Sequence, residues 1–497
     1  MRSPRVGTFP AVRRQLQGPG VLRRSYTRSV PPREEGEGAE GSPASVFASV
    51  RQSFWASGLV VPCFIAVQIL CQLALLVEAF SALRVVFRIF SFGASLAMLV
   101  LVPGRSVRHP ALPFVLGALV FTALNFFHPE ANTALAGLAQ LGIQLSIMAP
   151  LIWGTRLRMD AKAFRRTLAL LFLFNAASAG VGVLQVYFPG RFQPAMSAVI
   201  ESVGEDYTRS LQFELASGER VFRPFGLTDS PGGAATGAFY SVLLGAGFLI
   251  SSKRGLIRLL SVGGIMLGVL SLYLCQVRAI AMMLLVCLLA MGAVLALNGR
   301  VLRLTQLLLV VGGFAVVGFG WAVAVGGDAV TQRWGSLVSA DAGDVYYTNR
   351  GHFLENTVGY FLPQYPLGAG LGRYGMTNAY FGESSSALWA EIQWTAWVYD
   401  GGLPVLVLYP LGLLVSLFWA LRLALRRDDN HEFWLWGTLL FGYNVGAIAI
   451  TFSYPFFMSQ SGMEFWLLNA ALFGAFFHST RQAARSPLHE TLHPHRR

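Results

Sequence analysis

The chain has 497 residues, of which 54% are hydrophobic and only 13% are charged, and its mean hydropathy is +0.54. Soluble globular proteins carry about 25% charged residues, so this composition excludes a soluble fold. The net charge of +13 would suggest nucleic-acid binding in a soluble protein, but here the basic residues lie in short stretches between apolar runs. That pattern is typical of segments beside anionic lipid headgroups. We therefore expect membrane lipids as partners and no nucleic acid.

The four cysteines give no sign of a special site. They lie inside apolar runs, with no CxxC pair and no histidine at metal-ligand spacing: Cys63, Cys71, Cys275 and Cys287. Such residues usually act as small buried hydrophobic side chains. We expect no disulfide framework, no metal site and no cofactor.

Residues 1–52 are polar and rich in Arg, Pro, Gly and Ser, which predicts a disordered basic tail. The apolar stretch that a signal peptide needs after its basic start is missing, so we expect this tail in the cytoplasm. A membrane span needs about 20 apolar residues. On that criterion the sequence predicts an all-α polytopic membrane protein with about twelve transmembrane helices, at 57–80, 87–103, 111–127, 132–154, 166–188, 233–251, 257–277, 279–298, 303–325, 393–423, 433–453 and 463–478.

The charge of the connections supports this count independently. If the N-terminus is cytoplasmic, the basic connections all fall on the cytoplasmic side, as the positive-inside rule requires. An odd number of spans would break this alternation, so we expect both termini inside. The basic residues of that side include Arg105, Arg108, Arg156, Arg158, Lys162, Arg165, Arg166, Lys253, Arg254, Arg258, Arg300, Arg303, Arg422, Arg426 and Arg427.

Two long connections are expected on the outer side. The segment 53–325 would hold helices 1–9 and an outer loop at 189–232, and a large periplasmic loop would follow at 326–392. Helices 10–12 would occupy 393–480, before a cytoplasmic tail at 481–497. Long loops on one face of a scaffold commonly carry functional sites. The large loop also contains the run Pro366-Leu-Gly-Ala-Gly-Leu-Gly, which lacks the strand–turn–helix context of a dinucleotide site and predicts a flexible turn.

Arginines on the outer side are informative because the topology rule does not place them there. Arg278 lies between two apolar runs, at the predicted outer membrane boundary. It either snorkels to the headgroups or contacts an anion near the lipid surface. Arg223 precedes a Ser-Pro-Gly-Gly turn that leads into a helix, which suits either ordinary helix-start chemistry or a phosphate site at a helix N-terminus. Arg350, in the large loop, is either solvated or a further anion contact.

Acids and aromatic residues near the end of the large loop are candidates for catalysis and sugar binding. Glu391 is an acid near the outer end of a predicted helix, His352 is one of few outer histidines, and Asp400 begins an apolar run as part of Asp-Gly-Gly. Asp400 would otherwise simply mark a helix bend at the membrane edge. The tryptophans around Glu391 form either an interfacial belt or a sugar-stacking platform: Trp389, Trp394 and Trp397.

These residues resemble the superfamily of O-antigen polymerases and O-antigen ligases. The segment from Arg223 to Gly233 is similar to the one that these proteins carry before a mid-chain helix, and Gln276-Val-Arg278-Ala resembles their Ser-Arg-Gly at an outer helix boundary. Arg350, with the Pro366 run behind it, resembles the Arg and Pro-hydrophobic-Gly-x-Gly of their large loop. The family's later acid and glycine correspond to Asp400 and Gly402. Its His-Asn pair is replaced by Glu391-Ile392, which departs from the ligase pattern.

The resemblance implies a GT-C-like membrane glycosyltransferase whose donor is an oligosaccharide on undecaprenyl diphosphate. Arg278, Arg350 and Arg223 would bind the diphosphate, since Arg stays charged and binds phosphate oxygens bidentately. Glu391 or His352 would be the general base, with Asp400 as a further catalytic candidate. We expect a metal-independent, inverting polymerase in the bacterial inner membrane, with its active site facing the periplasm. A flippase and a chain-length regulator of the same pathway would be partners. The alternatives are a ligase-type transferase and a secondary transporter, although the transporter's matched halves are not evident.

Overall fold

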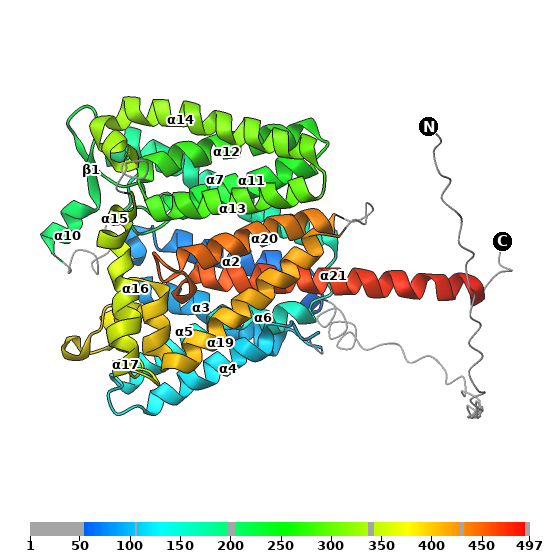
Figure 1. The fold of residues 1–497 in the computed structure, drawn as a ribbon, viewed down its shortest axis with the longest axis horizontal. Helices are drawn as coiled ribbons and strands as arrows, with labels where there is room; N and C mark the ends of the chain where they lie inside the picture. Colours follow the sequence, from blue (N-terminus) through cyan, green and yellow to red (C-terminus); the bar gives the residue numbers. More distant parts are fainter. Residues whose placement is uncertain (1–53, 105–106, 196–203, 336–341, 427–431, 493–497) are drawn as a thin grey trace, which may run out of the picture. The chain divides into compact units, whose positions relative to one another are not determined.

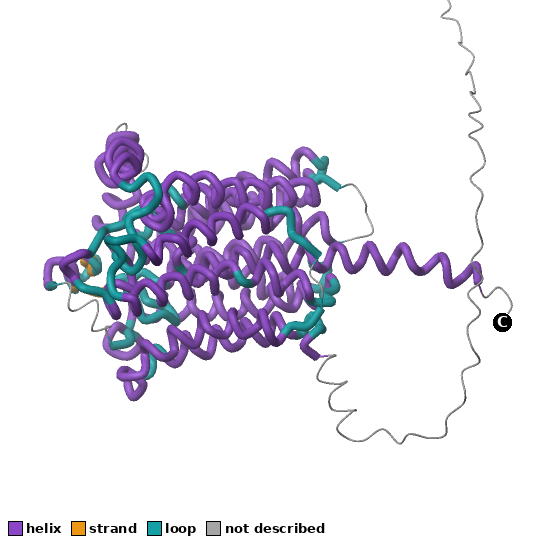
Figure 2. The backbone as a smooth tube through the Cα atoms, turned by 90° about the horizontal axis from the view of Figure 1, so that it is seen from below, coloured by secondary structure: helices purple, strands orange, loops and turns teal. Residues whose placement is uncertain are grey.

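The computed structural model describes residues 54–104, 107–195, 204–335, 342–426 and 432–492. These residues belong to one compact unit, which spans residues 49–497. The predicted tail at 1–52 lies outside the described residues. The described part is almost entirely helical, and Figures 1 and 2 show long helices packed side by side with most of the irregular chain at the two ends of the bundle.

Within the described residues, nine helical segments are long and apolar enough to cross a membrane. They are Glu78–Leu101 (η1 and α3), Ala134–Arg156 (α5, α6 and η3), α7 Ala161–Tyr187, α11 Ala234–Ser251, α12 Gly255–Cys275, α13 Arg278–Leu297, α14 Val301–Gly335, α19 Gln393–Ala424 and α20 Phe433–Ile450. Two apolar helices are shorter, α2 Val60–Ala74 and α4 Leu112–Leu124, and α21 spans Gln460–Leu492. The prediction of an all-α, multi-pass membrane protein is therefore confirmed.

Each of the twelve predicted spans overlaps one of these helices, but several boundaries differ. Helix α7 begins at Ala161, five residues before the predicted start, because the Asp160 side chain caps it by accepting a hydrogen bond from the Ala163 amide at 2.7 Å. Helix α14 runs ten residues past its predicted end, across a kink at Gly327. Helix α21 continues to Leu492, so the first part of the predicted C-terminal tail is helical.

The helices form layers that Figure 1 separates clearly. Helices α12, α14, α7, α11 and α13 lie on one side, α20, α2, α21 and α3 lie in the middle, and α19 and α4 lie on the other side. The basic turns around Arg156, Lys253 and Arg300 are at one end of this bundle. We call the opposite end the loop end; it carries residues 125–133, 188–195, 204–233, 342–392 and 451–459.

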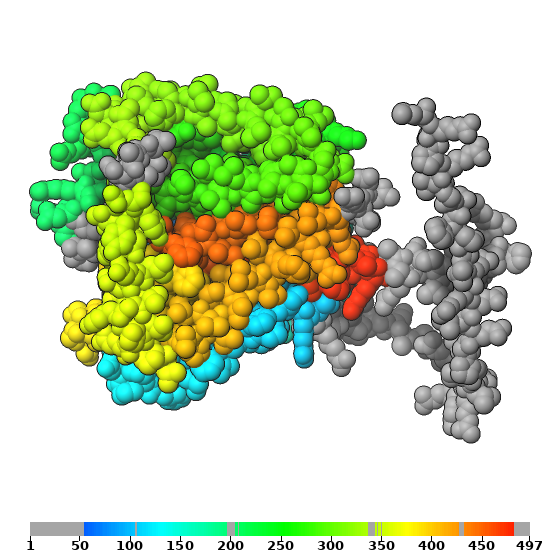
Figure 3. Space-filling model, in the orientation of Figure 1, coloured from blue at the N-terminus to red at the C-terminus, as the bar shows by residue number. Residues whose placement is uncertain are grey.

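The loop end has more regular structure than the word loop suggests. Its first long connection contains α8 Pro189–Phe192, α10 Glu205–Ser210 and an antiparallel hairpin of β1 Gln212–Glu214 and β2 Arg220–Phe222. Its second forms an almost continuous helix from α15 Ala342–Tyr346 through two π-turns and α16 His352–Asn356 to α17 Leu362–Gln364. Figures 1 and 3 show this yellow-green helix lying across the ends of the long helices. Helix α18 Gly375–Phe381 and the turn η6 Ser384–Ser386 follow it.

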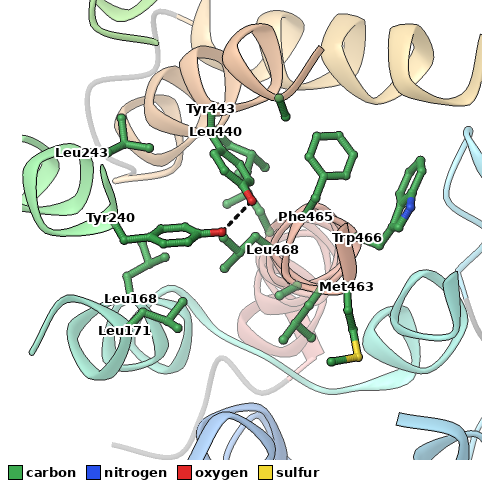
Figure 4. Packing of buried hydrophobic residues seen from close by; sticks show 14 of the residues in the cluster. Leu168, Leu171, Tyr240, Leu243, Leu440, Tyr443, Met463, Phe465, Trp466 and Leu468 are labelled. Atoms are coloured by element: carbon green, nitrogen blue, oxygen red, sulfur yellow. Dashed lines mark hydrogen bonds between the residues drawn. The ribbon is translucent and has the colours of Figure 1, made fainter. Parts of the chain in front are cut away.

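The centre of the bundle combines apolar packing with a few polar contacts between helices. The hydroxyls of Tyr240 on α11 and Tyr443 on α20 share a hydrogen bond of 2.7 Å among leucines and Phe465 (Figure 4). The side-chain amides of Asn444 on α20 and Asn469 on α21 exchange two hydrogen bonds of 2.9 and 3.0 Å. Polar pairs of this kind hold membrane helices in register, since no hydrophobic effect acts between helices in lipid.

Candidate functional site

Three arginines come together at the loop end. Arg278 is the first residue of α13, directly after a short break in which Gln276 adopts a left-handed conformation with φ 55°. Arg223 follows strand β2, and Arg333 lies near the end of α14. Arg278 and Arg223 are both close enough to Arg333 for their charges to repel its charge. We call Arg223, Arg278 and Arg333 the arginine cluster.

A glutamine on α7 fixes the segment that follows Arg223. The buried Gln185 side chain accepts hydrogen bonds from the amides of Phe225 and Gly226, both at 2.8 Å, and donates to the Gly226 carbonyl at 3.0 Å. Gly226 has φ +62° there, and a side chain would meet the Ser178 hydroxyl at 2.6 Å, so glycine is required. This clamp holds the backbone beside Arg223 in one conformation.

The same segment is also tied to the first helices of the bundle. Asp229 forms a salt bridge of 2.5 Å with Arg88 on α3, and Gln72 on α2 donates to the Leu227 carbonyl at 2.9 Å. The Cys275 sulfur lies 4.0 Å from the Pro224 carbonyl oxygen, next to the start of α13. The segment from Arg223 to Gly233 is therefore a rigid element that contacts α2, α3, α7 and the end of α12.

Arg350 and Glu391 form a second charged group. The Arg350 guanidinium donates to the Glu391 carboxylate, and both side chains are partly exposed. His352 follows on the same helix, where its Nδ1 lies 3.2 Å from the Tyr347 carbonyl oxygen. Among the described contacts, none joins this pair to the arginine cluster. Of the three predicted diphosphate ligands, Arg223 and Arg278 therefore lie in the cluster, whereas Arg350 lies beside the predicted base Glu391.

The three predicted sugar-binding tryptophans differ in accessibility. Trp389 is 70% exposed, whereas Trp394 is partly buried and donates to the Thr451 hydroxyl at 3.2 Å. Trp397 is only 2% exposed and packs between Tyr409 and Phe457. The Trp397 ring is enclosed by two aromatic neighbours in the core, so Trp389 is the most accessible of the three predicted sugar-binding tryptophans, and their role in sugar binding stays a prediction.

Asp400 lies in the interior and not at an accessible site. It is 1% exposed, and its carboxylate accepts hydrogen bonds from Gln140 at 2.5 Å, Gln144 at 2.7 Å and the Tyr374 hydroxyl at 2.7 Å. Burial and the nearby Asp400 carboxylate raise the pKa of Tyr374 well above its ordinary value of 10, so this hydroxyl keeps its proton and donates. These contacts give Asp400 the geometry of a structural anchor, and its catalytic role stays a prediction.

The glycines after Asp400 admit a second chain segment into the helix. Gly401 and Gly402 are non-helical, and a side chain on Gly402 would lie 2.1 Å from the Pro366 carbonyl oxygen. That oxygen accepts a hydrogen bond from the Leu403 amide at 2.9 Å, and the Asn125 side chain donates to the Leu367 carbonyl at 2.7 Å. The run from Pro366 to Gly372 is therefore a fixed brace between α4, α5 and α19, which overturns the prediction of a flexible turn.

The arrangement as a whole offers cations and a carboxylate at one end of a membrane bundle. In the described part of the chain, no group of three His, Cys, Asp or Glu side chains could hold a metal ion. A scan against protein-family models finds no matching family, and a search of curated proteins finds no matching sequence. The chemistry is therefore argued from the side chains alone.

Sequence reasoning missed two residues of the site. Arg333 was one of several outer arginines without a surrounding motif, and Gln185 was an ordinary polar residue near the end of an apolar run. A signal existed for Gln185, because a polar residue inside a predicted span is costly unless it has partners. Arg333 carries no comparable signal, since only the fold brings the end of α14 beside the start of α13.

Proposed function

We propose that this protein is a membrane glycosyltransferase that polymerises oligosaccharide repeat units carried on undecaprenyl diphosphate, at the outer face of the bacterial inner membrane. The observation that carries the proposal is the arginine cluster at the loop end. The Arg333 guanidinium is repelled by the charges of both Arg278 and Arg223, and an anion of two or more charges bound among these side chains would offset that repulsion. A diphosphate at the lipid surface has this charge.

The leaving group explains why cations are needed. As the acceptor hydroxyl attacks the anomeric carbon, a new carbon–oxygen bond forms there and the bond from that carbon to the diphosphate oxygen breaks. The diphosphate leaves with one additional negative charge. Arginines stabilise that developing charge when they are positioned in advance, and they remain protonated throughout. Attack from the side opposite the leaving group inverts the anomeric carbon.

The acceptor's proton needs a base, and Glu391 is the candidate with the better position. Its carboxylate accepts a hydrogen bond from the Arg350 guanidinium, which fixes the orientation that a base needs toward the acceptor hydroxyl. Arg350 is the third proposed contact of the diphosphate, and it lies beside the proposed base. His352 is the alternative base on the same helix.

The direct test uses purified protein in nanodiscs with a lipid-diphosphate-linked repeat unit, and products are separated on a gel. Wild-type protein should give a ladder of lengths, and Arg278→Ala should abolish it, whereas Arg220→Ala should not. Arg220 is a matched control because it is an exposed arginine only three residues from Arg223. One transfer per chain to a separate acceptor would indicate the ligase alternative, and full activity of Arg278→Ala would refute the proposed role of the cluster.

A further inference from the structure

A polar pocket lies at the loop end, away from both charged groups described above. It has a volume of about 470 Å³ and lies between the turn at 130–133 and the segment 373–386. Figure 3 shows the yellow and gold segment that contains 373–386 on the lower side of the loop end, beside the cyan helices, with green α14 on the upper side. Its lining is polar except for Ala131 and includes Glu130, Asn132, Thr133, Arg373, Glu383 and Ser385.

The pocket walls are held by specific contacts. The Arg373 guanidinium is 12% exposed and binds the Glu130 carboxylate at 2.6 Å, the Ser386 carbonyl at 3.0 Å and the Ala369 carbonyl at 2.9 Å. On the other wall, Asn132 pairs with the backbone of Glu383 through bonds of 3.2 and 2.9 Å. Because the Arg373 and Asn132 side chains already bind backbone groups of the pocket walls, the pocket is formed before any ligand arrives, which lowers the entropy cost of binding.

Two carboxylates in this pocket remain available as hydrogen-bond acceptors, beside the Ser385 hydroxyl. The Glu130 side chain is 56% exposed although one of its oxygens binds Arg373, and Glu383 uses its backbone, not its carboxylate, to bind Asn132. Carboxylates accept short, charge-assisted hydrogen bonds from hydroxyl groups. Two carboxylates against one guanidinium also give the pocket a net negative charge. A ligand with many hydroxyls and no negative charge fits this lining best.

We propose that this pocket is a glycan subsite that binds a neutral or amino sugar residue and disfavours uronic acids. The volume of about 470 Å³ lies within the range of about 300–1,000 Å³ found for small-ligand sites. The identification of the ligand as a glycan rests on the proposed function, whereas the preference against negative charge follows from the pocket alone. A subsite apart from the arginine cluster would hold the sugar chain while the diphosphate is bound elsewhere.

The test uses fluorescently labelled full-length protein in nanodiscs on an array of neutral, amino-sugar and uronic-acid oligosaccharides. Wild-type protein should retain neutral or amino-sugar glycans. Ser385→Trp, which fills the pocket, should abolish the signal. Glu383→Gln, which removes one charged acceptor, should weaken neutral binding about 10-fold, in line with one charge-assisted hydrogen bond, and should raise uronic-acid binding relative to neutral binding. Glu219→Gln makes the same change on the exposed turn of the hairpin and should leave every signal unchanged.

The outcomes separate this proposal from the proposed function. Glycan binding that depends on Ser385 and Glu383 supports the subsite even when no sugar is transferred from a lipid carrier. The absence of transfer would count against the proposed polymerase activity only. Transfer from the lipid carrier with unchanged array signals in both variants would refute the subsite and leave the polymerase standing. Absence of glycan binding by the wild-type protein, or preferential retention of uronic acids, would also overturn the subsite.

Discussion

Replacing Asp400 with alanine should destabilise the fold rather than remove a catalytic group. The substitution leaves the donors of Gln140, Gln144 and Tyr374 without their acceptor in the interior. A buried donor without a partner costs about 1–3 kcal/mol. Allowing for some rearrangement, we expect Asp400→Ala to lower the free energy of unfolding by about 3–5 kcal/mol, a large effect for one residue. Asp400→Asn retains one acceptor oxygen and should cost about 1–2 kcal/mol.

The measurement is an SDS titration of the protein in mixed micelles, followed by tryptophan fluorescence. Asp344→Ala is the matched control, because Asp344 is exposed on α15 and its loss should change stability by less than about 0.5 kcal/mol. The reasoning is refuted if Asp400→Ala unfolds at the wild-type SDS concentration while glycosyl transfer disappears. That outcome would support a catalytic role for Asp400.

Three further predictions follow from single positions. Gly402→Ala should destabilise the fold by about 2–4 kcal/mol in the same titration, because φ is +60° and the new methyl group would meet the Pro366 carbonyl. Wild-type stability of this variant would contradict the close packing of the Pro366–Gly372 run against α19. Glu391→Gln should reduce glycosyl transfer at least about 100-fold if Glu391 is the base, whereas His352→Asn should retain most activity, and the reverse result would exchange their roles. Burial lowers the pKa of His109 from 6.5 to about 3. The folded state therefore keeps His109 neutral while the unfolded chain binds a proton below pH 6.5. Stability due to this residue is complete above pH 6.5 and should fall by about 1.4 kcal/mol per unit as the pH drops toward 3. The loss of unfolding free energy between pH 7 and pH 5 should be smaller in His109→Phe than in the wild-type protein. An equal loss in both proteins would show that His109 does not cause the pH dependence.

The helical membrane fold was predictable because length and apolarity alone identify a span. The helix boundaries were harder to predict, since they depend on local contacts that hydropathy does not measure. The cap by Asp160 starts α7 within a basic stretch that looks like a connection. The kink at Gly327 lets α14 continue past two glycines that resemble a helix end. The helix across the loop end was not predicted, because residues 342–364 mix polar and apolar side chains without a run long enough for a span.

The candidate site was predictable in part. Arg223 and Arg278 were found because a cation at a predicted membrane boundary needs an explanation, and the fold brings both beside Arg333. Asp400 and Trp397 were interpreted as site residues because sequence gives a residue's position along a helix but not the direction in which its side chain points. The structure turns both inward. Gln140 and Gln144, which enclose Asp400, lie 260 and 256 residues away along the chain, and Phe457 packs on Trp397 from a different helical segment. No local pattern identifies such contacts.

The central claim, that the arginine cluster binds the diphosphate of a lipid carrier, is tested most directly by binding of undecaprenyl diphosphate to the protein in nanodiscs, with undecaprenol as the uncharged comparison. Each of Arg278→Ala and Arg333→Ala should weaken binding of the diphosphate by about 10- to 100-fold, as expected for loss of one charge-assisted contact of about 1.5–3 kcal/mol. Arg220→Ala and wild type should bind alike, and undecaprenol should bind all four proteins equally. Wild-type affinity for the diphosphate in both cluster variants would contradict the account.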